Sequence, residues 1–147
     1  MNTPQPLKQV ILYADDDRDD ITLVEEAFTS VNNIELITAD NGEDALTYLK
    51  KLSMLDPNPC LIILDINMPK LNGKETLARI RQMDRFSKVP VVLFTTSCQS
   101  ADKNFADKYN AGFVTKPTNQ HQLKNITEQF IDYCTADTLK ILQRYQD

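Results

Sequence analysis

Several short apolar runs in this chain end at residues that could take part in chemistry. VILYA is followed by Asp15 and Asp16, LIIL by Asp65, VVLF by Thr95, and FVT by Lys116. Runs of this length that are rich in Val, Ile and Leu are typical of buried parallel strands. Because parallel strands end at one edge of their sheet, where open α/β sheets bind ligands, we expect these side chains to converge. Three carboxylates, a hydroxyl and an ammonium together suit Mg²⁺ and phosphate.

The elements that must position these residues alternate between strand and helix patterns. We expect strands over residues 10–14, 34–39, 60–64, 89–94 and 113–115. The expected helices begin after Asp17, after Asn41, near Gly73, near Ser100 and near Asn119, and the last one ends at Tyr133. This alternation predicts an α/β fold, a flavodoxin-like (βα)5 doubly wound sheet of five parallel strands in the order 2-1-3-4-5. In that order the first and third strands are neighbours, which brings the acidic pair beside Asp65.

The bulk composition is that of one ordinary globular domain. The chain has 147 residues, of which 41% are hydrophobic and 25% are charged. We expect a flexible lead over residues 1–8, one domain over residues 9–134, and a tail over residues 135–147. A formal net charge of −5 disfavours binding to nucleic acid. No apolar stretch is long enough to span a membrane, and the polar start lacks a signal-peptide core.

The cysteines suggest neither a metal site nor a redox motif. Cys60, Cys98 and Cys134 are far apart and odd in number, no CxxC pair occurs, and His121 is the only histidine. A zinc site is therefore disfavoured. We interpret the three as buried or idle thiols, which fits a protein of the reducing cytoplasm.

Three carboxylates in one cleft repel each other unless a cation compensates them. Mg²⁺ is the natural candidate, because it is a hard cation that binds oxygen and retains waters. We expect Asp16 and Asp65 to be direct ligands, Asp15 to hold a metal-bound water, and the backbone carbonyl of Asn67 to be a further ligand. The alternative for the acidic run is a solvated helix start. The charged residues at the ends of other strands weigh against it.

Asp65 stands alone after LIIL, where a carboxylate can attack phosphorus and form an acyl phosphate. Lys116 and Thr95 supply the ammonium and the hydroxyl that stabilise a transferring phosphoryl group. Taken singly, Lys116 could be a surface lysine and Thr95 an ordinary strand residue. A cis bond before Pro117 would aim Lys116 into the site, whereas a trans loop proline is the commoner arrangement.

Four segments together resemble the receiver domain of two-component response regulators, the CheY-like domain. They are ILYADDD, LIILDINMPKLNG, PVVLFTTS and AGFVTKP, and their order and spacing agree with that family over about residues 10–133. The proline-bearing loop over residues 53–59 and the TTS sequence resemble single-domain receivers associated with bacteriophytochromes. Ala14 stands where Val is commoner in the family, and we expect little effect from this difference.

The resemblance implies a role for each site residue. Asp65 matches the residue that accepts a phosphoryl group from the phosphohistidine of a sensor histidine kinase, here of phytochrome type, or of a histidine phosphotransfer protein. Asp15 and Asp16 match the pair that binds Mg²⁺. The switch hydroxyl, the lysine, and the aromatic residue whose rotamer reports activation match Thr95, Lys116 and Phe113.

The resemblance also implies how such a chain works. It would be a phosphoacceptor switch that catalyses only its own phosphorylation and dephosphorylation, rather than an enzyme with an external substrate. The residues after Tyr133 are too few for a DNA-binding or catalytic output domain, so the output is expected to pass through an unidentified protein partner. We expect this partner, or a second copy in a homodimer, on the face formed by the fourth helix, the fifth strand and the fifth helix.

Two alternatives stay open on the sequence alone. A pseudo-receiver would use the same fold only as a binding module, which the presence of all five site residues disfavours. A phosphatase of the haloacid dehalogenase type also uses an Asp nucleophile. It usually carries a second Asp two residues later, where this chain has Asn67, and its acidic pair follows the nucleophile instead of preceding it.

Overall fold

The computed structural model describes residues 8–144, with side chains for residues 8–119 and 121–135. Its parallel strands form one sheet in the order β2-β1-β3-β4-β5, which confirms the predicted order. The strands are β1 (Gln9–Ala14), β2 (Ile34–Ala39), β3 (Leu61–Leu64), β4 (Val91–Thr95) and β5 (Gly112–Thr115). The helices are α1 (Arg18–Phe28), α2 (Gly42–Lys51), α3 (Gly73–Gln82), the 3₁₀ turn η1 (Asp84–Phe86), α4 (Ser100–Lys108) and α5 (Gln120–Arg144).

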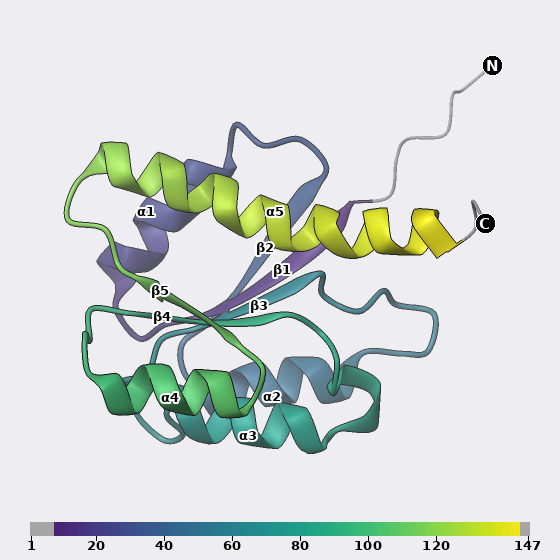
Figure 1. Cartoon of the computed structure of the whole chain (residues 1–147), viewed down its shortest axis with the longest axis horizontal. Coiled ribbons are helices and arrows are strands. Elements are labelled where there is room, and N and C mark those ends of the chain that lie inside the picture. Colours follow the sequence, from purple (N-terminus) through teal and green to yellow (C-terminus); the bar gives the residue numbers. More distant parts are fainter. Residues whose placement is uncertain (1–7, 145–147) are drawn as a thin grey trace.

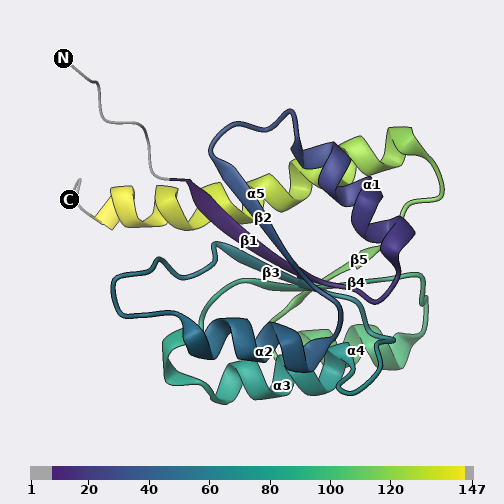
Figure 2. The same cartoon turned by 180° about the vertical axis from the view of Figure 1, so that it is seen from behind.

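The helices cover both faces of the sheet. α1 and α5 lie on one face, and α2, α3 and α4 lie on the other, as the two opposite views in Figures 1 and 2 show. Right-handed crossovers between parallel strands produce this three-layer arrangement. Within the described residues, no helix is both long and apolar enough to cross a membrane.

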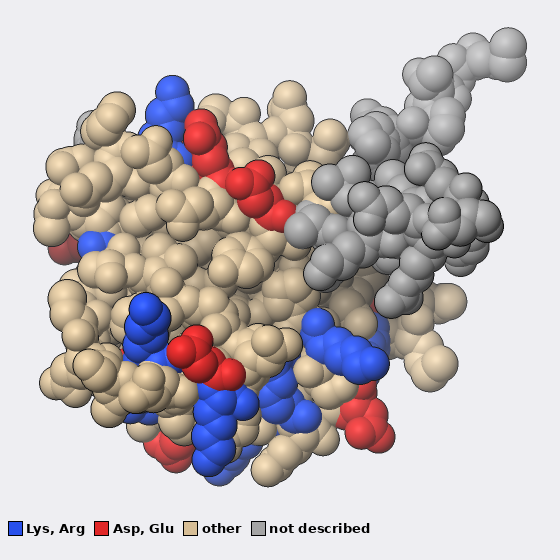
Figure 3. All heavy atoms as spheres, viewed as in Figure 1, with Lys and Arg blue, Asp and Glu red and all other residues tan. Residues whose placement is uncertain are grey.

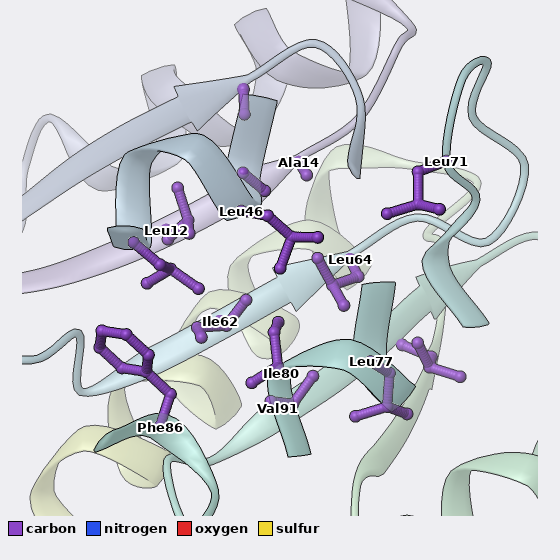
Figure 4. Close-up of a cluster of buried hydrophobic side chains, with 14 of the residues drawn as sticks. Leu12, Ala14, Leu46, Ile62, Leu64, Leu71, Leu77, Ile80, Phe86 and Val91 are labelled. Atoms are coloured by element: carbon purple, nitrogen blue, oxygen red, sulfur yellow. The ribbon is translucent and has the colours of Figure 1, made fainter. Parts of the chain in front are cut away.

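Successive strand residues point to opposite faces and so divide the core in two. Leu12, Ile62 and Leu64 pack beneath α2 and α3, and Figure 4 shows this cluster. Their neighbours Tyr13 and Ile63 pack on the other side, against α1 and α5. Because both faces are covered, the central strands are apolar throughout, as parallel strands require.

The predicted helix starts agree with the structure. The Asp17 carboxylate caps α1 by accepting from the amides of Asp19 and Asp20, and Asn41 and Asn72 cap α2 and α3 in the same way. Side-chain acceptors at these positions satisfy amides that have no partner inside the helix. They also fix where each helix begins after the loop that carries the site.

The last helix differs from the prediction. We expected it to end at Tyr133, but α5 continues to Arg144. No Gly or Pro follows Pro117, so the sequence contains none of the residues that usually stop a helix. Residues 1–7 of the lead predicted over residues 1–8 lie outside the described residues, and so does the end of the predicted tail. So do the side chains of its apolar residues Leu139, Ile141, Leu142 and Tyr145.

The interpretation of all three cysteines as buried or idle thiols is wrong for two of them, because these two are not thiols. Cys60, just before β3, forms a disulfide with Cys134 on α5, and their Cα atoms are 4.9 Å apart. Only Cys98 is an exposed free thiol in the described part of the chain. The two paired positions are 74 residues apart, so their pairing is a property of the fold that sequence spacing does not reveal. The support that idle thiols gave to a cytoplasmic location is lost, and the location stays a prediction.

Candidate functional site

Backbone pairing places the predicted site residues in one row at the carboxyl edge of the sheet. The amide of Asp65 donates to the carbonyl of Ala14 at 3.0 Å, which sets Asp15 and Asp65 side by side. The amide of Lys116 donates to the carbonyl of Thr95 at 2.8 Å. The register of the sheet therefore brings together side chains that lie far apart in the sequence.

The three predicted carboxylates form a compact cluster. Asp15, Asp16 and Asp65 each offer an oxygen, and these oxygens lie within 4.8 Å of one another. Asp15 and Asp65 are buried whereas Asp16 is exposed, so the cluster faces solvent on one side. Oxygen donors in this arrangement fit a hard divalent cation that keeps several of its waters. Asn67, whose carbonyl is the further predicted ligand, is exposed between the buried residues Ile66 and Met68.

Lys116 reaches into the cluster and is not a surface lysine. Its ammonium lies 2.8 Å from Asp15, 2.7 Å from Asp20 and 3.5 Å from Asp65, and only 9% of its side chain is exposed. Burial lowers the pKa of Lys116, but the hydrogen bonds to Asp15 and Asp20 outweigh it and raise the pKa above its usual value. Because the described residues contain no cis peptide bond, the bond to Pro117 is trans, and the side chain reaches the site without a cis turn.

Asp15 is held from several sides. It accepts a hydrogen bond from the Tyr13 hydroxyl at 2.6 Å and one from the amide of Asp17 at 2.9 Å, in addition to its ion pair with Lys116. Burial, followed by the charge of Asp15, raises the pKa of Tyr13 far above its ordinary value, so the phenol stays a hydrogen-bond donor. These contacts fix the orientation of a buried carboxylate that would otherwise be costly.

Asp65 is chemically the most distinctive residue of the site. Burial and the nearby charge of Asp15 raise its pKa from 3.8 to about 6, against the opposing effect of Lys116. A carboxylate in such a place is deprotonated at neutral pH but poorly solvated. Since water shields it less than an exposed carboxylate, it is well placed to act as a nucleophile.

The third segment of the site is the β4–α4 connection. Thr95 is buried, and its hydroxyl oxygen accepts a hydrogen bond from the amide of Ser97 at 3.2 Å. Phe113, on the neighbouring strand β5, is half-buried against the core beneath α3 and α4. Both residues lie where the sequence predicts, and the Phe113 ring is neither fully buried nor fully exposed.

A close approach of α3 shapes the loop that follows Asp65. The amide of Gly73 donates to the carbonyl of Ile66 at 2.9 Å. A side chain at Gly73 would collide with the backbone carbonyl of Asp65. Only glycine lets the helix start this close to the site, so this residue fixes the path of the β3–α3 loop.

Two participants at this edge were not foreseen. Asp20 lies in the first turn of α1 and pairs with Lys116. Tyr13, on β1, donates a hydrogen bond to Asp15. A helical-wheel reading from Asp16 to Asp20 could have suggested the first. Nothing in the sequence marks Tyr13, because a tyrosine in a buried strand is ordinary.

One family model matches most of the sequence. The model of the response regulator receiver domain covers residues 11–128. The chain belongs to this family. The matched range includes every predicted site residue from Asp15 to Lys116.

Curated relatives agree with this assignment. Response regulator Rcp1 of Synechocystis sp. is 39% identical over 97 residues, which make up 64% of this chain and 66% of Rcp1. The probable methanogenesis regulatory protein FilR2 of Methanothrix harundinacea is 28% identical over 130 residues, 84% of this chain and 82% of FilR2. CpxR of Escherichia coli is 32% identical over 114 residues, 77% of this chain and 45% of CpxR. The chain thus matches just under two thirds of Rcp1 and less than half of CpxR.

Solved structures confirm the predicted CheY-like fold and the similarity to phytochrome-associated receivers. The phosphorylated cyanobacterial phytochrome response regulator RcpA matches with a TM-score of 0.78 at 29% identity, over 88% of this chain and 96% of RcpA. The Mn²⁺-bound form of Rcp1 matches with a TM-score of 0.74 at 33% identity, over 84% of this chain and 92% of Rcp1. Its metal and the acidic cluster of this chain together fit divalent cation binding.

Proposed function

We propose that this chain is a phosphorylation switch in which Asp65 accepts a phosphoryl group from a phosphohistidine. The observation that carries the proposal is the position of Asp65 beside the acidic pair and 3.5 Å from the Lys116 ammonium. A carboxylate oxygen of Asp65 forms the new bond to phosphorus while the bond from phosphorus to the imidazole nitrogen breaks, and that nitrogen keeps the electron pair. Hydrolysis of the acyl phosphate later returns Asp65 and inorganic phosphate. The chain would therefore act only on its own phosphoryl group and not as an enzyme with an external substrate.

The residues around Asp65 divide the work. Asp15, Asp16, Asp65 and the carbonyl of Asn67 are the groups that would hold Mg²⁺, which when bound neutralises charge on the phosphoryl oxygens. Lys116 would donate to one of those oxygens, since its ammonium already lies 3.5 Å from Asp65. Charge-assisted hydrogen bonds of this kind are among the strongest that a protein offers to a phosphoryl group.

The signal would leave the site through Thr95 and Phe113. The Thr95 hydroxyl can donate to the new phosphoryl group, and the Phe113 ring can then occupy space that Thr95 vacates. Because phenylalanine carries no hydroxyl, its inward rotamer leaves no polar group without a partner. Such a change is a shift between two packings that a local charge event drives.

Both the family and the surface of the molecule support a proposal for the partners. The likeness to RcpA, a phytochrome response regulator, supports a phytochrome-type sensor histidine kinase as donor, directly or through a histidine phosphotransfer protein. Figure 3 views the face that carries α4, β5 and α5, where basic side chains gather towards α3 and α4 and the surface between α4 and α5 is largely uncharged. We place the downstream protein, or a second copy of the chain, on this face.

Phosphorylation is tested directly by intact mass. The chain is incubated with acetyl phosphate and Mg²⁺, and we expect one added phosphoryl group in the wild type and none in Asp65→Asn. Asp107→Asn, which changes an exposed carboxylate on α4, is the matched control and should be modified like the wild type. Uptake by Asp65→Asn at wild-type yield would contradict the assignment. A wild type that takes up nothing would favour a binding module, and sustained hydrolysis of phosphate esters would favour a phosphatase.

A further inference from the structure

A chain of polar contacts leads away from the site between α3 and α4. The hydroxyl of Ser97, whose amide donates to Thr95, donates to the carboxylate of Asp102 at 2.6 Å. The other oxygen of Asp102 forms an ion pair with the ammonium of Lys74, which also lies 5.5 Å from the centroid of the Phe105 ring. The contacts thus run without a gap from the Thr95 hydroxyl to the first turn of α3.

The ion pair between Lys74 and Asp102 is largely shielded from solvent. The side chain of Asp102 is 9% exposed and that of Lys74 is 29% exposed. The hydrogen bonds from Lys74 and Ser97 lower the pKa of Asp102, so the carboxylate stays charged through the neutral range. A charge in this position needs both partners, because burial would otherwise penalise it.

The contacts join the two loops that flank the site. Lys74 lies in the first turn of α3, after the loop that leaves Asp65, and Asp102 lies in the first turn of α4, after the loop that leaves Thr95. A polar cavity of about 420 Å³ lies between the loops, with Asn67 among its lining residues on one side and Thr96 on the other. The β4–α4 loop therefore has room to move once the contacts that hold it are released.

We propose that Lys74, Asp102 and Ser97 form a latch that holds Thr95 in the arrangement of the unmodified protein. The latch rests on the proposed function, because it opposes the movement of Thr95 towards a phosphoryl group on Asp65. It acts through the Ser97 amide, which occupies an acceptor lone pair of the Thr95 hydroxyl and fixes the path of the loop. These three are positioning residues, since none of them touches the reacting atoms.

Two variants open the latch in different ways. Lys74→Met keeps most of the side-chain stem but removes the charge, and Asp102→Asn keeps an acceptor for Ser97 but removes the ion pair. Lys74→Arg retains the charge and serves as the conservative rescue. Lys103→Met is the matched control, because Lys103 is an exposed lysine on α4 with no ion pair in the described part of the chain.

The readout is the affinity for beryllofluoride, a mimic of the phosphoryl group, measured by calorimetry in the presence of Mg²⁺. A latch that stabilises the unmodified arrangement has to open before beryllofluoride binds, which weakens the affinity. Its removal should therefore tighten beryllofluoride binding by about threefold. We expect this gain in Lys74→Met and in Asp102→Asn, and wild-type affinity in Lys74→Arg and Lys103→Met. Ring signals of Phe113 in NMR spectra without the mimic should shift towards those of the bound form in the first two variants alone.

The outcomes separate the latch from the function on which it rests. If the wild type binds beryllofluoride and both charge-removing variants bind it no more tightly, the latch is wrong, even if their melting temperatures fall. Weaker binding in those variants would overturn it as well. A wild type that binds no beryllofluoride and takes up no phosphoryl group would overturn the proposed function itself.

Discussion

Replacing Asp65 with asparagine is expected to stabilise the metal-free protein near neutral pH, although it removes the proposed phosphoryl acceptor. Burial and the charge of Asp15 raise the pKa of Asp65 from 3.8 to about 6. A carboxylate with a raised pKa costs the folded state free energy wherever the group is ionised in the unfolded chain. Asparagine keeps the shape and avoids this cost.

The size of the effect follows from the two pKa values. A difference of about two units at 1.36 kcal/mol each gives a penalty of about 3 kcal/mol above the folded-state pKa. Between the two values the folded state binds more protons than the unfolded chain, so stability falls as pH rises. Below the unfolded-state pKa the penalty disappears. At about pH 4.5, just above that pKa, the penalty on the free energy of unfolding is only about 1 kcal/mol.

The assay is urea unfolding in EDTA at about pH 4.5 and about pH 8. Asp65→Asn should exceed the wild type by about 3 kcal/mol at the higher pH and by about 1 kcal/mol at the lower one. Asp107→Asn is the control, and its free energy of unfolding should match that of the wild type at both pH values. If Asp65→Asn is no more stable than the wild type at the higher pH, then burial and the charge of Asp15 do not destabilise ionised Asp65, and the reasoning is wrong.

Three further predictions concern the metal, the lysine and the disulfide. Asp16→Ala should abolish measurable Mg²⁺ binding in a calorimetric titration, whereas Asp15→Ala, which removes only a water-mediated contact, should weaken it by about 10–100-fold. Lys116→Ala should lower the free energy of unfolding by about 3 kcal/mol, because it leaves buried carboxylates without their partner, and it should reduce the structural change caused by beryllofluoride without preventing phosphorylation. Reduction of the bond between Cys60 and Cys134 should lower the free energy of unfolding by about 4 kcal/mol, because it frees a loop that joins positions 74 residues apart.

Each of these has an outcome that counts against it. Equal Mg²⁺ affinities for the two aspartate variants would refute the division into direct and water-mediated contacts. A Lys116→Ala protein that responds to beryllofluoride like the wild type would show that the ammonium has no part in switching. For the disulfide, Cys98→Ser should keep the full sensitivity to dithiothreitol and Cys134→Ser should lose it, and any other pattern would contradict the pairing.

The fold was predictable from the sequence because the central strands β1, β3 and β4 are buried on both faces. Runs such as LIIL have no polar residue to break them, so each one stands out, and the residue that ends it, such as Asp65, marks the edge of the sheet. Side-chain acceptors such as Asp17 mark the helix starts by equally local chemistry. These features need only a few neighbouring residues, which is why they could be found without the structure.

Some of the missed features depend on how the folded chain packs. The Tyr13 hydroxyl donates to Asp15 because it is buried away from water. The pairing of Lys74 with Asp102 requires α3 and α4 to be neighbours. The extension of α5 was missed for a different reason, since its sequence lacks a stop signal and we ended the helix where the apolar pattern faded. For Tyr13 and for the pair of Lys74 and Asp102, packing decided what local patterns left open.

The charges at the site are the reason that the proposed function includes a cation and a rearrangement of Lys116. Asp15, Asp20 and Asp65 pair with the ammonium of Lys116, and Asp16 lies in the same carboxylate cluster. If all four carboxylates are ionised, the charge of this ammonium leaves three negative charges uncompensated. In the proposed transfer, an incoming phosphoryl group would add more negative charge, so we expect the transfer to require a divalent cation. The ammonium of Lys116 forms ion pairs with three carboxylates, and the one with Asp65, at 3.5 Å, is the longest. It is therefore the contact that Lys116 can exchange for a phosphoryl oxygen at the least cost, while Asp15 and Asp20 keep the side chain in place.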